Sequence, residues 1–98
     1  MSAGESPLAG VRREIDAIDG ELVRLLAARE VLVRRAGALK RDEQAVRAPG
    51  RVEEVIAKVR GLAAESGASP EVVERVYRAM IGAFVDLELA QHRADRRP

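Results

Sequence analysis

The sequence predicts an all-α protein with three helices per chain, of which the first is very long, interlaced with a second copy as an intertwined homodimer. Apolar residues recur at alternating steps of three and four, which is typical of amphipathic helices, and prolines fall where helices can begin. Only Tyr77 and Phe84 are aromatic, so the core must consist of aliphatic side chains, which suits packed helices. The length of 98 residues predicts one domain over residues 1–98.

The first helix is expected over residues 7–41, because Ser6 can cap it and Pro7 suits a first turn that needs no amide donor. A helix of this length spans on the order of 50 Å, whereas a globule of this size has a radius of gyration of about 13 Å. One chain therefore cannot cover its heptad seam, and we expect a partner chain to do so. The seam consists of Leu8, Val11, Ile15, Ile18, Leu22, Leu25, Arg29, Leu32, Ala36 and Leu39.

The second helix is expected over residues 49–66. Residues 42–48 are polar or short and are expected to form a loop that precedes Pro49. Gly67 then occupies the usual position of a left-handed helix cap.

The third helix is expected over residues 70–92. Ser69 and Pro70 repeat the combination of a capping residue and a first-turn proline. Residues 93–98 are expected to be frayed, as chain ends often are.

Composition excludes several classes of function. The net charge is +1, from 17 basic and 16 acidic residues that are interspersed, which argues against a nucleic-acid or anionic-membrane partner. No apolar run is long enough for a membrane span, and residues 1–7 lack the pattern of a signal peptide, so we expect a cytoplasmic protein. Cysteine is absent and His92 is the only histidine, so we expect neither a metal site nor a Ser-His-Asp triad.

Arg29 occupies a seam position where the pattern predicts leucine. It is either an arginine that pairs with a carboxylate across the seam or a buried guanidinium that grips an anionic ligand. Lys40 lies eleven residues later, within about 20° of the same helix face and about 16 Å along the axis. Two long cationic side chains at that separation leave room for one small dianionic molecule.

Arg12 lies about 25 Å before Arg29 along the helix and cannot reach the same ligand from the same chain. If two first helices pack antiparallel about a two-fold axis, Arg12 of the partner subunit approaches the middle of the other helix. This arrangement predicts two equivalent sites, each with one arginine from the partner.

Glu88 falls on the apolar face of the third helix, one turn beyond Phe84. A surface position is therefore a poor explanation. The carboxyl group either pairs with an arginine or belongs to a site, where it keeps its proton and donates a hydrogen bond.

These positions together resemble the all-helical class of chorismate mutases, including the related isochorismate-pyruvate lyases. The resemblance covers about residues 8–92 and rests on segments 11–19 and 25–29, followed by Lys40 and Arg51. It implies an interlaced dimer with two shared active sites that convert chorismate to prephenate in aromatic amino-acid biosynthesis. This isomerase reaction is pericyclic, so it needs no nucleophile, metal or cofactor.

The resemblance also implies roles for single residues. Arg12 of the partner subunit and Arg29 would hold the two substrate carboxylates, and Lys40 would contact a carboxylate and the ether oxygen. Arg51 would close over the site, and Glu88 would donate a hydrogen bond to the ether oxygen. Bacterial members often have glutamine at the position of Glu88, and a glutamate must be protonated for this role.

Two differences from the pattern of the family leave more than one substrate compatible with the sequence. Typical bacterial mutases carry acidic residues at the positions of Ala48 and Val52, which are apolar here. Residues 48–52 resemble isochorismate-pyruvate lyases, and they also allow a 4-amino-4-deoxychorismate mutase. A non-catalytic helical dimerisation module is a third interpretation, but Arg29 in the seam and Glu88 on an apolar face count against it. Some small mutases are activated by a larger partner enzyme, and the sequence leaves such a partner unknown.

Overall fold

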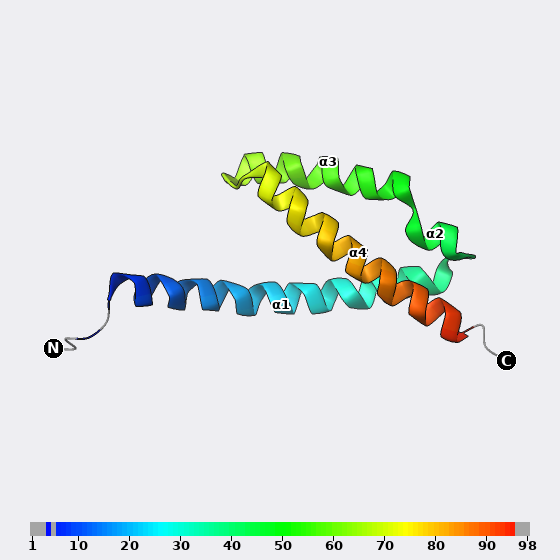
Figure 1. The fold of residues 1–98 in the computed structure, drawn as a ribbon, viewed down its shortest axis with the longest axis horizontal. Helices are drawn as coiled ribbons and strands as arrows, with labels where there is room; N and C mark the ends of the chain where they lie inside the picture. Colours follow the sequence, from blue (N-terminus) through cyan, green and yellow to red (C-terminus); the bar gives the residue numbers. More distant parts are fainter. Residues whose placement is uncertain (1–3, 5, 96–98) are drawn as a thin grey trace. The chain divides into compact units, whose positions relative to one another are not determined.

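The computed structural model describes residue 4 and residues 6–95, and this part of the chain is helical without strands (Figure 1). The helices are α1 (Pro7–Leu39), α2 (Glu43–Arg47), α3 (Pro49–Ser66) and α4 (Pro70–Asp95). The predicted all-α class with three long helices is therefore confirmed. The chain divides into two compact units, residues 1–32 and 33–98, so the expectation of a single domain stays a prediction.

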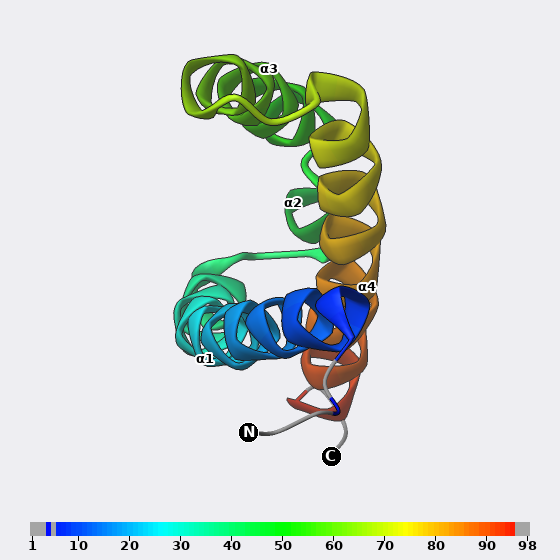
Figure 2. The ribbon, with the colours of Figure 1, turned by 90° about the vertical axis from the view of Figure 1, so that its left-hand side faces the viewer.

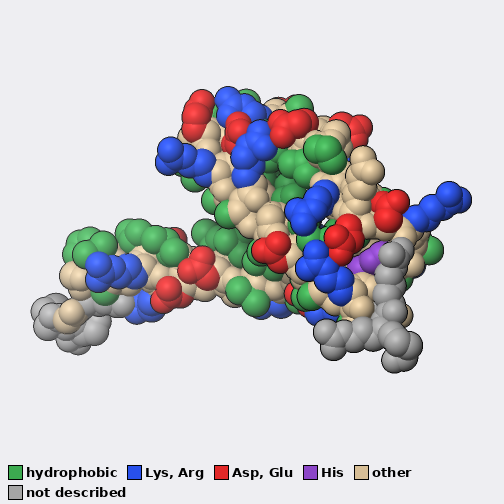
Figure 3. Space-filling view, turned by 45° about the vertical axis from the view of Figure 1, so that its right-hand side comes forward, with side chains coloured by type: hydrophobic (Ala, Val, Ile, Leu, Met, Phe, Trp, Pro, Cys, Tyr) green, Lys and Arg blue, Asp and Glu red, His purple; other side chains and the backbone are tan. Residues whose placement is uncertain are grey.

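Helix α1 begins as the sequence predicts and ends two residues earlier than expected. The Ser6 hydroxyl accepts a hydrogen bond from the Ala9 amide at 3.1 Å, which caps the first turn. None of the residues of α1 is buried within the chain. The large apolar side chains of its seam are between 50% and 86% exposed, and hydrophobic side chains gather along this helix in Figure 3. Those seam residues are Leu8, Val11, Ile15, Ile18, Leu22, Leu25, Leu32 and Leu39.

The expected loop at residues 42–48 was wrong, because most of it forms helix α2. The Asp42 carboxylate accepts a hydrogen bond from the Ala45 amide at 2.8 Å, so Asp42 acts as an N-cap. Val46 anchors the short helix, since its side chain is only 3% exposed. Ala48 ends α2 with φ 34° and ψ 64°, a left-handed conformation that disfavours a residue with a Cβ by about 1–2 kcal/mol.

Helices α3 and α4 form an antiparallel hairpin whose starts and turn follow the predicted signals. Gly67 has φ 79°, and its amide bonds to carbonyls in the last turn of α3. The Ser69 hydroxyl accepts from the Val72 amide at 3.3 Å at the start of α4. Helix α4 runs to Asp95, so residues 93–95 are helical rather than frayed, while residues 96–98 lie outside the described residues.

The second unit holds the core of the chain. Helix α4 packs against both α3 and α2, as Figure 2 shows. The buried apolar residues of the described chain all lie here, and one carboxyl group is buried among them. They are Val46, Ile56, Val59, Ala63 and Leu89, with Glu88 as the buried acidic residue.

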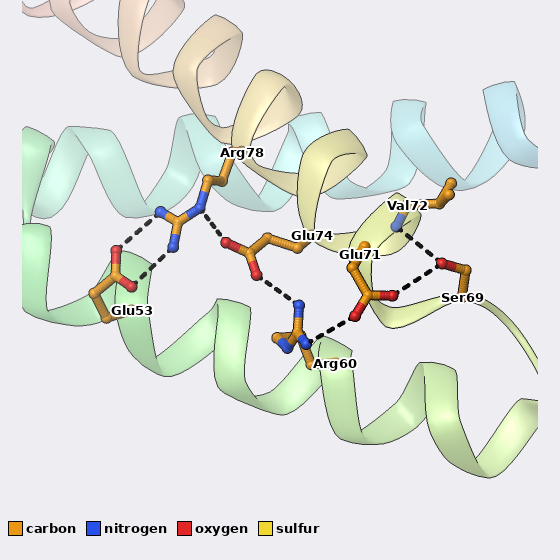
Figure 4. Close-up of polar contacts among 7 residues, drawn as sticks. All are labelled: Glu53, Arg60, Ser69, Glu71, Val72, Glu74 and Arg78. Atoms are coloured by element: carbon orange, nitrogen blue, oxygen red, sulfur yellow. Dashed lines mark hydrogen bonds and ion pairs between the residues drawn. The ribbon is translucent and has the colours of Figure 1, made fainter.

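An exposed network of ion pairs joins α3 to α4 (Figure 4). Arg78 grips the Glu53 carboxylate with two hydrogen bonds of 2.9 and 3.0 Å and donates to Glu74 at 2.7 Å. Arg60 of α3 donates to Glu74 at 2.8 Å and thereby extends the network along the hairpin. The hydrogen bonds from Arg78 hold the pKa values of Glu53 and Glu74 below their ordinary value, although burial acts in the opposite direction.

This network makes the stability of the hairpin dependent on pH. The pKa values of Glu53 and Glu74 are lowered in the folded state, so the two carboxylates stabilise the folded protein. Their contribution to the free energy of unfolding is complete above the ordinary pKa of 4.5 and is lost as the pH falls through the lowered pKa values. We expect the urea midpoint of the wild-type protein to decrease when the pH is lowered from 5 to 3. The urea midpoint of Arg78→Met should decrease less over the same range. Arg75→Met, at an exposed position of the same helix, serves as the control. Equal pH dependence of wild type and Arg78→Met would contradict the prediction.

Candidate functional site

Lys40 and Glu88, two of the predicted site residues, meet in the second unit although 48 positions separate them. Lys40 directly follows α1, and its Nζ donates a hydrogen bond of 2.9 Å to Glu88 Oε2. The Glu88 side chain is 7% exposed and that of Lys40 is 27% exposed. A buried carboxyl group needs such a partner, and a charge-assisted bond of this length is among the stronger polar contacts in proteins.

The backbone of the last turn of α1 sets the position of Lys40. The Lys40 amide donates to the Gly37 carbonyl at 3.2 Å, a three-residue closure that tightens the helix end. This closure ends α1 at Leu39, and Lys40 then extends its side chain to α4. The end of α1 therefore determines where the Lys40 side chain lies.

A pocket beside α4 is lined in part by residues that lie one to two turns before Glu88. Ile81, Val85 and Glu88 follow one another at steps of four and three, so they share one helix face. Val52 of α3 lines this pocket, of about 370 Å³, together with Ile81 and Val85. Gly82 and three charged residues complete the lining, namely Arg47, Arg78 and Asp86.

One of the two sequence departures lies at this pocket, and the other does not line it. Val52 forms part of the pocket wall, whereas Ala48 holds the left-handed junction between α2 and α3. Aspartate adopts left-handed conformations more readily than alanine. An acidic residue at position 48 would therefore suit the backbone better than the alanine present, and the alanine makes this junction less polar.

Arg51, which the resemblance places over the site, is exposed in this structure. It lies in the first turn of α3 with a side chain that is 71% exposed, and its guanidinium is 4.0 Å from the Glu54 carboxylate. This is a loose surface pair between residues three apart on one helix. The part of Arg51 in closing the site stays a prediction.

Arg12 and Arg29 belong to the first unit. Arg12 is exposed, and Arg29 is half-buried within the single chain. Both lie on α1, where the heptad seam places them, and their approach to a ligand stays a prediction. Sequence reasoning did not identify Arg47, Arg78 or Asp86, because charged residues on helix surfaces give no signal of their own.

Within residues 4 and 6–95, no group of three histidine, cysteine, aspartate or glutamate side chains could hold a metal ion. The helices of this part of the chain are also too short or too polar to cross a membrane.

Comparison with known proteins assigns this arrangement to one family. A family model described as chorismate mutase type II matches residues 11–89, a range that contains every predicted site residue. A bifunctional chorismate mutase/prephenate dehydratase of Aquifex aeolicus (strain VF5) is 36% identical over 85 residues. The aligned region covers 83% of this chain and 24% of that protein, so the chain spans about a quarter of the length of this curated relative.

Proposed function

Because the chain belongs to the chorismate mutase type II family, we propose that it catalyses the rearrangement of chorismate to prephenate. The observation that carries the proposal is the part-buried Lys40–Glu88 pair, in which Lys40 Nζ lies 2.9 Å from Glu88 Oε2. In the proposed role the enzyme is an isomerase of aromatic amino-acid biosynthesis and acts in the cytoplasm.

The reaction needs positioning and electrostatic stabilisation rather than a nucleophile. One carbon–oxygen bond breaks as a carbon–carbon bond forms, and negative charge develops on the ether oxygen. Lys40 supplies a positive charge for that oxygen, and protonated Glu88 supplies a hydrogen bond. The low exposure of the Glu88 side chain, 7%, strengthens these interactions, because charges and hydrogen bonds act more strongly away from water.

Substrate binding requires further cations for the two carboxylates of chorismate. We propose Arg29 and Arg12 of the partner subunit for this role, since guanidinium groups bind carboxylates bidentately. Arg51 of α3 would close over the bound substrate by moving from its exposed position. Fixing both carboxylates holds the substrate in the conformer that reacts.

The second candidate is isochorismate-pyruvate lyase, with 4-amino-4-deoxychorismate mutase as a related possibility. The observation that favours this group is Val52, which presents an apolar side chain to the pocket at a position where typical bacterial mutases have an acidic one. The change alters the surroundings of the substrate's ring substituent without removing the cations.

The function is tested by supplying purified protein with chorismate, isochorismate and 4-amino-4-deoxychorismate in separate reactions. We expect prephenate from chorismate, measured against Lys40→Ala as an inactive control. Pyruvate from isochorismate alone would establish the lyase instead. A ligand at about 100 times its dissociation constant adds about 2.7 kcal/mol to the free energy of unfolding, so binding of chorismate should raise the melting temperature. If no substrate is converted and the melting temperature does not change with chorismate, the result favours a dimerisation module over an enzyme.

The homodimer is part of the same proposal. Helix α1 leaves an apolar seam exposed along its whole length, with Leu22 at its centre 50% exposed. A continuous apolar surface of this kind marks an interface, and a second copy of the same helix has the matching heptad pattern.

We expect the protein to sediment as a dimer and to lose helicity on dilution to nanomolar concentration, because no folded monomer covers the seam. Leu22→Lys should dissociate the dimer, whereas Asp16→Lys, on the opposite face of α1, should not. The measurement is sedimentation velocity combined with circular dichroism. A Leu22→Lys protein that remains a fully helical dimer would refute the seam as the interface.

A further inference from the structure

Gly37 has a close neighbour that the other glycines lack. A Cβ atom built on Gly37 would stand 3.3 Å from both Cγ and Oε2 of Glu88, and 3.4 Å from its Cδ. At the remaining glycines the nearest neighbour is 3.9 Å away or more. The bare Cα of Gly37 therefore forms a notch that holds the Glu88 carboxyl group.

The same residue contacts both members of the Lys40–Glu88 pair. Its carbonyl accepts the Lys40 amide at 3.2 Å, and its Cα faces the Glu88 oxygen that accepts from Lys40 Nζ. Position 37 therefore affects the placement of both the ammonium and the carboxyl group. All three residues lie in the second unit.

Helical energetics alone do not explain a glycine here. Alanine is the better residue in the interior of a helix, because glycine has more backbone freedom to lose. Position 37 lies inside α1, where a plain helix would favour alanine. Close approach of another group is the usual reason for such a glycine.

We propose that Gly37 is a positioning residue, which sets the Glu88 carboxyl against Lys40 at the distance the reaction requires. The proposal rests on the proposed function, in which these two groups act on the ether oxygen. A methyl group at position 37 would move the Glu88 side chain by a few tenths of an ångström. Glu88 is only 6% exposed, so the groups packed around it limit how far its side chain can move to relieve the crowding.

The first test is Gly37→Ala, with Gly61→Ala as the matched control. Gly61 lies inside α3 and has nothing within 4 Å of a built Cβ. We expect Gly37→Ala to lower kcat about tenfold with KM little changed, because small misplacements of a catalytic group act on the transition state. Gly61→Ala should keep its kcat and melt at a higher temperature. An unchanged kcat in Gly37→Ala would overturn the proposal.

A second test asks whether the effect passes through Glu88. In a Glu88→Ala background the crowded group is absent, so Gly37→Ala should cause no further loss of the residual kcat. An equal fold-loss in both backgrounds would show that Gly37 acts elsewhere and would overturn the proposal. If Gly37→Ala alone does not fold, the Gly37→Ala/Glu88→Ala double variant should fold with the urea midpoint of Glu88→Ala. A double variant that also fails to fold would overturn the proposal.

A third test is independent of catalysis. The coupling between Lys40→Met and Glu88→Gln, taken from urea midpoints in a double-mutant cycle, should fall by half or more in the Gly37→Ala background. Unchanged coupling would mean that Gly37 does not determine the positions of Lys40 and Glu88 relative to each other. If the wild-type protein converts none of the three substrates, the proposed function is wrong, while this cycle still decides the role of Gly37.

Discussion

Replacing Lys40 with alanine is expected to lower the turnover of chorismate by about 10³-fold, because in the proposed mechanism its charge stabilises the ether oxygen. The side chain already bonds to buried Glu88 at 2.9 Å, so its position is fixed before substrate arrives. Such preorganisation makes a charge more effective than the same charge on a mobile surface residue. Steady-state kinetics on the purified protein provide the measurement.

The control is Lys58→Ala, which removes the other lysine of the chain from an exposed position on α3 and should leave turnover unchanged. Lys40→Ala also leaves the Glu88 carboxyl without its donor, which can destabilise the fold. Lys40→Gln keeps an amide that can donate to Glu88, and it should be nearly as inactive as Lys40→Ala. Turnover of Lys40→Gln within tenfold of wild type would show that charge at this position is not required.

The proposal that each site takes arginines from both chains leads to a related prediction. Chains with Arg12→Ala and chains with Arg29→Ala should each be inactive alone and should regain activity when mixed, because a heterodimer then contains one intact site. With random exchange between C2 dimers, roughly a quarter of wild-type sites should return. No recovery after subunit exchange would mean that each site uses both arginines from one chain.

Local signals explain how well the helix starts could be predicted. Ser6 and Ser69 cap their own helices, and Gly67 turns the chain, so each signal acts within a few residues. Helix α2 was missed because its five residues are too few to show a helical period. Asp42 was the available signal, and it has the properties of an N-cap.

The site was predictable only in part, because its central contact is tertiary. The sequence shows that Glu88 breaks an apolar face and that Lys40 continues a helix face, but it does not show that one bonds to the other. The expected alternative was an arginine as the partner of Glu88, and the structure has Lys40 there instead. Gly37 was visible only as a glycine inside a helix, since its neighbour Glu88 belongs to another helix and is distant in the sequence.

Protonation of Glu88 is the remaining requirement of the mechanism. In the structure Oε2 accepts from Lys40 Nζ, which leaves Oε1 as the oxygen that can carry a proton toward the substrate. A carboxyl group can donate a hydrogen bond to the ether oxygen only in its acid form, and a carboxylate there would repel the developing negative charge. The acid form is more populated at lower pH, so we expect kcat to fall as the pH rises.

Glu88→Gln should remove this pH dependence, because an amide of similar shape is a donor at every pH. We expect the activity of the variant to depend less on pH than that of the wild-type protein. Glu65→Gln, at an exposed position of α3, should keep the wild-type profile. The measurement is kcat and kcat/KM from pH 5 to pH 9 for the three proteins. If wild type and Glu88→Gln give the same profile, Glu88 does not donate to the reacting oxygen, and its burial beside Lys40 serves the fold alone.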